Sequence, residues 1–185
     1  MDGAEREIGP LETARLRVSP ATRADTAALQ ACLDAAPDYF VRTEGAPARD
    51  DEAAQRLDDA EADDQRALYL ILPRARKSVR PEPVEGRTDE RARCAVGVLD
   101  LHLGFPEPDA VHVGLLLFRE PCQGLGYGRE VVTALEGAAA VAGWAAVRLS
   151  VGDENPDART FWERLGYAVA GRIDRGVTVL EKALR

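Results

Sequence analysis

The stretch from Val111 to Ala142 constrains the fold of this 185-residue chain more than any other segment. Residues 111–118 are apolar and partly β-branched, and polar residues bound them on both sides, which predicts a buried strand. From Arg129 onward, apolar residues recur at spacings of three and four, which predicts a helix. The segment between the strand and the helix contains three glycines, Gly124, Gly126 and Gly128.

A glycine-rich turn between a strand and a helix favours phosphate binding. Glycine leaves the backbone N–H groups accessible and permits positive φ angles. The first turn of the helix adds N–H groups without intrahelical partners and the positive end of the helix dipole. The turn lacks the Lys-Ser/Thr pair of nucleoside-triphosphate loops, and its glycine spacing differs from the dinucleotide fingerprint.

A second informative segment lies downstream. Residues 146–151 alternate like a strand, and Asn155-Pro156 then opens another helix pattern that continues to Arg164. Gly166 is the expected C-cap of that helix, directly before a further strand.

Together the two segments resemble the GNAT N-acetyltransferase superfamily. The resemblance rests on Gln123-x-x-Gly126-x-Gly128 and on Asn155-x-x-Ala158-x-x-Phe161-Trp162-x-x-x-Gly166-Tyr167, which occur in the family's order and about the family's distance apart. It implies an α/β fold of the α+β layered kind, with a mixed, mostly antiparallel seven-stranded sheet flanked by four helices. Its central strands are expected to splay apart where the cofactor enters.

The whole chain, residues 1–185, is expected to form one domain of this kind. Residues 73–93 contain almost no apolar side chains, which predicts a flexible insertion between two strands. Residues 1–12 are polar and predict a loose terminus. Other strands are expected at 14–18, 67–72, 94–103, 167–173 and 177–184, with helices from about 22 to 37 and around 53–60.

The resemblance implies acetyl-CoA as the acyl donor. Its pantetheine arm is expected along the main chain of the central strand and its diphosphate at the glycine turn, with Arg164 toward the adenosine phosphate. The expected cofactor-binding residues are Leu116, Leu117, Phe118, Gln123, Gly124, Leu125, Gly126, Tyr127, Gly128, Arg129, Asn155 and Trp162.

Transfer of the acetyl group to a primary amine, by direct attack in a ternary complex, is the expected reaction. The catalytic candidates are His112, at a position where the family often has a glutamate, and Asn155, which matches a position that orients the cofactor. A hydrogen-bonded histidine without a catalytic role is the other interpretation of His112. His102, Asp100, Glu120, Asp153 and Glu154 are further candidates for the base.

One residue departs from the family pattern. Trp162 stands where the family often has a tyrosine that protonates the departing thiolate, and an indole N–H does not titrate usefully. A non-catalytic acetyl-CoA-binding domain with a regulatory role is therefore the alternative function.

The acceptor is expected to be a small molecule, because no signature of an extended groove is visible. Tyr39 and Phe40 are the expected substrate contacts, since the family places this segment beside the acceptor pocket. Residues 1–65 contain 16 Asp and Glu against 7 Arg, a balance of −9. This acidity is interpreted either as a solvated helix face or as a field that attracts a cationic amine.

Composition excludes several other partners. The net charge of −8 argues against nucleic acid, and no apolar run is long enough to span a membrane. Three widely spaced cysteines indicate reduced thiols in the cytoplasm and no metal site. The resemblance also implies that two copies pair as a homodimer, while the residues themselves leave the oligomeric state open.

Overall fold

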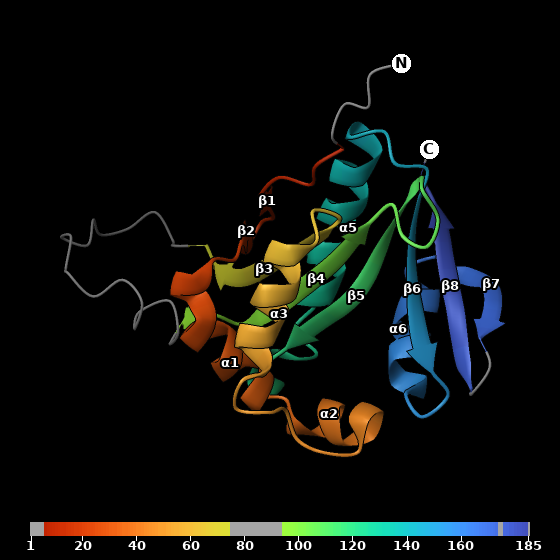
Figure 1. Ribbon diagram of the computed structural model, residues 1–185. Coiled ribbons are helices and arrows are strands. Elements are labelled where there is room, and N and C mark those ends of the chain that lie inside the picture. Colours follow the sequence, from red (N-terminus) through yellow and green to blue (C-terminus); the bar gives the residue numbers. More distant parts are fainter. Residues whose placement is uncertain (1–5, 75–93, 174–175, 185) are drawn as a thin grey trace.

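A computed structural model describes residues 6–74, 94–173 and 176–184 of the chain. Their strands form one sheet of eight in the order β1-β2-β3-β4-β5-β6-β8-β7, with helices on both faces (Figure 1). The strands are β1 (Leu11–Glu12), β2 (Leu16–Pro20), β3 (Arg66–Pro73), β4 (Gly97–Leu103), β5 (Ala110–Phe118), β6 (Ala146–Gly152), β7 (Ala168–Ile173) and β8 (Val177–Ala183). The α-helices are α1 (Thr26–Asp34), α2 (Pro37–Glu44), α3 (Glu52–Ala62), α5 (Tyr127–Val141) and α6 (Pro156–Arg164), with 3-10 turns η1 (Arg23–Asp25) and η2 (Glu120–Cys122).

The predicted class is confirmed, because the layered sheet is antiparallel at every pairing except that of β5 with β6. The described residues form eight strands and five α-helices, however, where the sequence predicted seven and four. The additional helix is α2, which begins at Pro37, where the sequence predicted that the preceding helix ends. Proline fits the first position of a helix because its missing N–H has no intrahelical partner there. Of the predicted 73–93 insertion, residues 75–93 lie outside the described residues.

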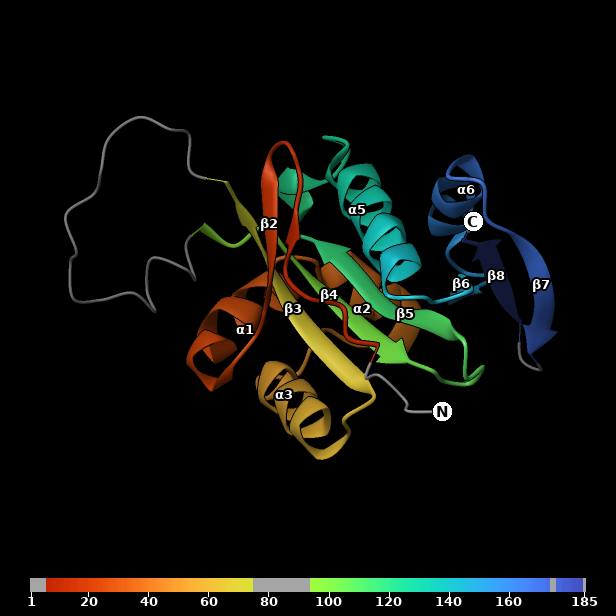
Figure 2. The same cartoon turned by 90° about the horizontal axis from the view of Figure 1, so that it is seen from above.

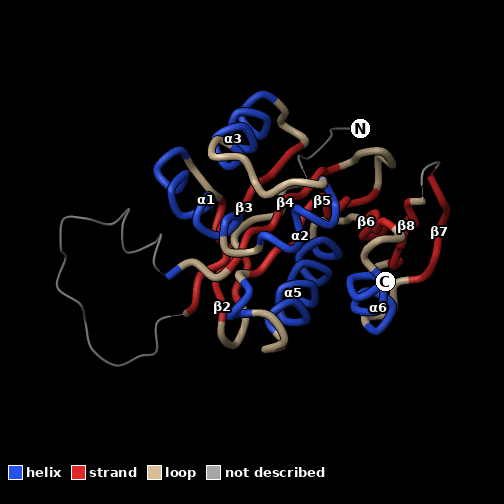
Figure 3. Tube along the Cα trace, turned by 90° about the horizontal axis from the view of Figure 1, so that it is seen from below, coloured by secondary structure: helices blue, strands red, loops and turns tan. Residues whose placement is uncertain are grey.

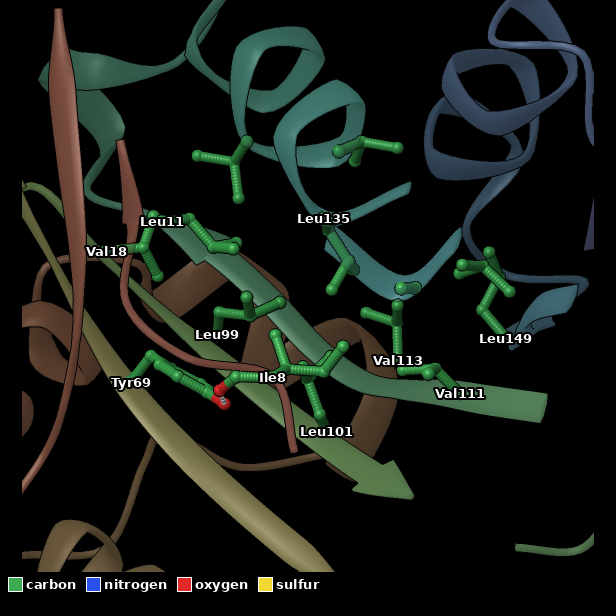
Figure 4. Close-up of a cluster of buried hydrophobic side chains, with 14 of the residues drawn as sticks. Ile8, Leu11, Val18, Tyr69, Leu99, Leu101, Val111, Val113, Leu135 and Leu149 are labelled. Atoms are coloured by element: carbon green, nitrogen blue, oxygen red, sulfur yellow. Dashed lines mark hydrogen bonds between the residues drawn. The ribbon is translucent and has the colours of Figure 1, made fainter. Parts of the chain in front are cut away.

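The additional strand, β1, lies within the segment predicted to be loose. Leu11 pairs with Val18 of β2, and the side chains of Ile8 and Leu11 are buried. The Tyr69 hydroxyl donates a hydrogen bond to the Ile8 carbonyl (Figure 4). The prediction of a loose terminus was therefore wrong from Ile8 onward, because two apolar side chains are enough to anchor this segment to the core.

Two hydrophobic cores lie on opposite faces of the sheet. Figures 2 and 3 show α1 and α3 on one side and α5 on the other. Under α5 and α6 the core includes Val111 and Leu135. Under α1, α2 and α3 it includes Leu29, Phe40 and Leu57. The sheet is thus covered on both faces, as its long apolar strands require.

A β-bulge at Gly114 shifts the register of β5 against β4. Before the bulge, Val111 and Val113 pack into the core under α5. After it, Leu115 and Leu117 pack on the opposite face, against the helices α1–α3. One inserted residue reverses the phase of a strand, so the two halves of β5 direct their side chains to different cores.

Buried ion pairs fix the polar helix α3 to the sheet. Asp100 of β4 is 1% exposed and accepts hydrogen bonds from Arg66 Nε (3.1 Å) and Nη2 (2.7 Å). Arg56 Nη1 of α3 lies 3.2 Å from the same carboxylate, and Arg56 also pairs with Glu52 at 3.0 Å. Because a buried charge needs such partners, this cluster determines where α3 lies on the sheet.

Among the described helices, none is long and apolar enough to cross a membrane.

The burial of Ile8 predicts that the N-terminal segment contributes to stability. Ile8→Ala should lower the free energy of unfolding by about 2–4 kcal/mol, because it removes packed methyl groups from a filled core. Val141→Ala is the control, since that side chain is 91% exposed and its loss should change stability by less than about 0.5 kcal/mol. Urea unfolding followed by circular dichroism measures both; equal stability of the two variants would contradict the assignment of Ile8 to the core.

Candidate active site

The sheet divides between β5 and β6. These parallel strands pair only over Ala110–Val113 of β5 and Ala146–Leu149 of β6. Beyond that point they diverge, and α2 lies across the end of the gap (Figure 1). Residues Leu115–Phe118 therefore keep β4 as a neighbour on one edge and, within the described chain, have no strand partner on the other. Such an edge can pair with an added extended ligand.

A cavity of about 810 Å³ occupies this division. Its walls come from α2, the end of β5, the glycine turn and the start of α5, and from α6. Segments more than 100 residues apart in the chain thus meet at one site. Most of the predicted cofactor-binding residues line it: Leu116, Leu117, Phe118, Gln123, Gly124, Gly126, Tyr127, Gly128, Arg129, Asn155 and Trp162.

The glycine turn has the geometry that its sequence predicts. Gly126 is the N-cap of α5 and has a φ of +81°, which favours glycine. Gly128 allows a close approach, because a Cβ there would lie 2.9 Å from Phe161 Cζ of α6. The N–H groups of the first helical turn, from Tyr127 to Arg129, have no intrahelical acceptors and lie beside the cavity. The prediction that the helix starts near Arg129 was two residues late.

Gln123 joins this turn to the strand. Its side-chain Nε2 donates a hydrogen bond of 2.9 Å to the carbonyl of Phe118, the last residue of β5. The backbone N–H of Glu120 donates to the carbonyl of Ala35, at the end of α1. These two bonds hold the turn at a fixed position relative to the free strand edge.

Asn155 and Arg42 lie on opposite walls of the cavity. Asn155 is the N-cap of α6, and its Oδ1 accepts a hydrogen bond of 3.2 Å from the backbone N–H of Ala158. Arg42 Nη1 of α2 donates to the same oxygen at 3.3 Å. A contact therefore bridges α2 and α6. The sequence did not indicate Arg42, because only the packing of α2 brings it to the cavity.

Three arginines line the cavity together with three carboxylates, those of Asp38, Glu120 and Asp157. Arg42, Arg129 and Arg164 all line it, and none forms an ion pair within the described residues. Elsewhere in this acidic protein, Arg56 and Arg66 are neutralised by nearby carboxylates. Unpaired guanidinium groups around a helix N-terminus are suited to bind an anion such as a phosphate.

Trp162 is 6% exposed and packs edge-on against the rings of Phe161 and Tyr167. It lines the cavity, but its indole supplies no titratable group. The Trp162 side chain thus borders the cavity, as predicted, and also packs in the core as a large apolar residue does.

Of the two predicted acceptor contacts, only Tyr39 lines the cavity. Burial is the main cause that raises the pKa of the Tyr39 phenol, so it stays protonated at neutral pH and can donate a hydrogen bond. Phe40, next in the chain, has 0% exposure and packs in the core under α1–α3. Successive residues of α2 point in different directions, and this places Phe40 away from the cavity.

His112 lies at the start of the division but does not line the cavity. It pairs across strands with His102 on one side and Arg148 on the other, one residue before the end of the β5–β6 pairing. Burial, followed by the neighbouring His102 and Arg148, lowers the pKa of the His112 imidazole. Its Nδ1 is buried, with no hydrogen-bond partner in the described residues. Leu125 likewise does not line the cavity and is half exposed.

A divided sheet with a free strand edge, a helix N-terminus and unpaired arginines can bind an elongated ligand that carries phosphate. The sequence matches the family model for the acetyltransferase (GNAT) domain over residues 15–168, well over half of the chain. The chain therefore belongs to the GNAT acetyltransferase family. A search of the curated proteins gives no match.

Solved structures share the fold. An acetyltransferase from Thermus thermophilus is 24% identical with a TM-score of 0.74, and the match covers 95% of this chain and 99% of that one. A spermidine N-acetyltransferase from Vibrio cholerae in complex with CoA and spermine is 13% identical (TM-score 0.65; coverage 91% and 95%). The PaiA N-acetyltransferase from Thermoplasma acidophilum in complex with coenzyme A is 12% identical (TM-score 0.63; coverage 91% and 98%). At these identities the similarity establishes the fold alone.

The surroundings of His112 predict its protonation state. Because its pKa is lowered, the imidazole should titrate below the ordinary value of about 6.5 and be neutral at pH 7. The unfolded chain then binds the proton more readily, so the free energy of unfolding should fall as the pH drops below about 6.5. Histidine ring resonances followed by NMR measure the midpoint, and His102→Gln assigns the two signals. A midpoint for His112 at or above 6.5 would contradict this environment.

Proposed function

We propose that the protein is an acetyl-CoA-dependent N-acetyltransferase that acetylates a primary amine of a small molecule. The observation that carries the proposal is the free edge of β5 at Leu115–Phe118 ending at a glycine turn that caps a helix. An extended arm on the strand and a diphosphate on the turn would each meet unpaired backbone groups. The neighbouring structures in complex with CoA support this donor.

In this proposal each wall of the cavity has a separate task. The main chain of Leu116, Leu117 and Phe118 pairs with the pantetheine arm as an added strand would. The N–H groups from Tyr127 to Arg129 bind the diphosphate, and Arg129 and Arg164 add positive charge. Backbone N–H groups near the end of β5 polarise the acetyl carbonyl, where negative charge develops during attack.

The amine approaches where β5 and β6 separate. Gly114 is exposed at this point, and His112 precedes the last residue paired with β6. A neutral imidazole near pH 7 can accept a proton from an ammonium group, directly or through a water molecule. His112 is therefore proposed as the base, Asn155 as the residue that orients the donor, and Tyr39 as the acceptor contact on α2.

A cationic small-molecule amine agrees with one feature of the acidic N-terminal region. Asp38 lines the cavity, whereas Glu52 and Asp59 on α3 form ion pairs with arginines. Six of the 16 carboxylates of residues 1–65 form ion pairs with arginines in the described part of the chain, and Asp38 is the one of the 16 that lines the cavity. The V. cholerae neighbour in complex with spermine is consistent with a cationic acceptor.

The tryptophan at position 162 favours the alternative function, a non-catalytic acetyl-CoA-binding domain with a regulatory role. Without a tyrosine at this position, the departing thiolate must take its proton from another group or from water, or leave unassisted. Measuring CoA binding tests the proposed donor site, and measuring the release of coenzyme A from acetyl-CoA tests whether the protein is a catalyst.

Replacement of Gly126 tests the donor site. Gly126→Val forces a β-branched residue into positive φ and should weaken CoA binding about tenfold or more. Gly137→Ala, in the same helix, is the control, since a Cβ there meets nothing within 4 Å and CoA affinity should not change. Isothermal titration calorimetry with CoA measures both variants, and circular dichroism checks that they fold. Equal CoA affinities of the two folded variants would contradict the proposal that the diphosphate binds at this turn.

Steady-state release of coenzyme A from acetyl-CoA should distinguish the two functions. We expect release with one or more polyamines, aminoglycosides, amino acids or peptides, and intersecting double-reciprocal plots that indicate a ternary complex. Cys122 is the cysteine in the cavity lining, and a covalent acetyl-enzyme would form on its thiol. Cys122→Ala should retain turnover, because direct attack does not use that thiol. Tight binding of acetyl-CoA without release in the presence of any acceptor would favour the regulatory domain.

A further inference from the structure

Arg15, in the connection between β1 and β2, reaches across the sheet edge to the glycine turn. Its Nη2 donates a hydrogen bond of 2.8 Å to the carbonyl of Leu125, which is 110 residues away in the chain. Its guanidinium carbon lies 4.5 Å from the centre of the Tyr127 ring. Its Nε lies 2.5 Å from Glu130 Oε1 on the first turns of α5. One side chain therefore contacts the turn before, at and after the start of the helix.

These contacts occupy the outer side of the turn and leave its inner side to the cavity. Arg15 does not line the cavity, whereas Gly124, Gly126 and Tyr127 do. A Cβ on Gly126 would lie 3.4 Å from Arg15 Nη2. The guanidinium thus supports the backbone of the turn from behind, at the residue with positive φ, and does not block the N–H groups that face the cavity.

Arg15 neutralises the negative charge of Glu130, which lies close to the proposed phosphate site. A carboxylate near the N-terminus of α5 interacts favourably with the helix dipole but repels a phosphate bound at the same place. Thr13 Oγ1 donates a hydrogen bond of 2.8 Å to Glu130 Oε2, and Arg15 binds the other oxygen. The connection between β1 and β2 therefore both holds and neutralises this carboxylate.

We propose that Arg15 is a positioning residue for donor binding: it holds the glycine turn in its binding conformation and neutralises Glu130 beside the diphosphate. The inference rests on the proposed function, because it assumes that a diphosphate binds at this turn. It assigns a role in donor affinity to a residue outside the cavity and outside the recognised motifs.

Calorimetric titration of variants with two ligands tests this role. CoA carries the diphosphate, and S-acetyl-pantetheine lacks it but keeps the arm. Arg15→Ala should weaken CoA binding about tenfold, the size typical of a lost charge-assisted contact, and leave S-acetyl-pantetheine binding unchanged. Arg17→Ala is the matched control, since Arg17 lies on the same hairpin and pairs with Glu12.

Further variants separate the two contributions of Arg15. The double variant Arg15→Ala/Glu130→Gln should bind CoA several-fold more tightly than Arg15→Ala alone, because the unbalanced carboxylate is gone. Arg15→Lys should give an intermediate affinity, since it keeps the charge but loses the planar fork. In turnover assays Arg15→Ala should raise the KM for acetyl-CoA with little change in kcat at saturation.

Three results would overturn the inference. CoA affinity in Arg15→Ala equal to that of the unsubstituted protein would exclude any role in donor binding. An equal loss of affinity for both ligands, together with a lower melting temperature, would show a general effect on folding. If the unsubstituted protein itself does not bind CoA, the proposed function fails first, and the role of Arg15 fails with it.

Discussion

The bulge at Gly114 is the feature on which the rest of the site depends. It reverses the phase of β5, so that Leu115 and Leu117 pack under α1–α3 while Val111 and Val113 pack under α5. At the same residue β6 stops pairing with β5. A backbone edge without a partner is costly when it is buried and invites a new strand when it is accessible. The fold keeps this edge accessible to a cavity, which is what a ligand with an extended amide-containing arm requires.

Local chemistry on either side of the division completes the site. The hydrogen bond from Gln123 to Phe118 sets the distance from the strand edge to the helix N-terminus. The close approach of Gly128 to Phe161 brings α5 against α6. Charges follow the same division of tasks: carboxylates neutralise Arg56 and Arg66 where α3 meets the sheet, whereas Arg129 and Arg164 face the cavity without ion-pair partners in the described residues. The guanidinium groups without ion-pair partners are available to an anionic ligand, while the carboxylates of Asp38, Glu120 and Asp157 line the same cavity.

Sequence patterns predicted the parts of this molecule that local interactions determine. The apolar run of β5, the glycine turn and the Asn155 cap are each defined by a few neighbouring residues, and all were found. The helix α2 was missed because Pro37 is read equally well as the end of one helix or the first residue of the next. Its cavity residues Asp38 and Arg42 were therefore missed as well.

The sequence patterns could not predict contacts between elements that are distant in the sequence. Arg15 meets Leu125 only because β1 and β2 pack beside α5, and no local spacing encodes this contact. The burial of Phe40 and of Ile8 was not predicted for the same reason, because each depends on which elements become neighbours in the folded sheet. Whether His112 acts as the base stays a prediction, because its side chain lies beside the division and outside the cavity lining.

Hydrogen–deuterium exchange with and without acetyl-CoA tests the central claim most directly, because it follows individual stretches of backbone. We expect bound acetyl-CoA to slow exchange in two separate segments, the free edge of β5 at Leu115–Phe118 and the first turn of α5 at Tyr127–Arg129. In these segments the N–H groups of β5 that point away from β4, and those of the first turn of α5, have no strand or helix partner in the described fold. Saturating acetyl-CoA that leaves both segments as exchangeable as before would contradict the account.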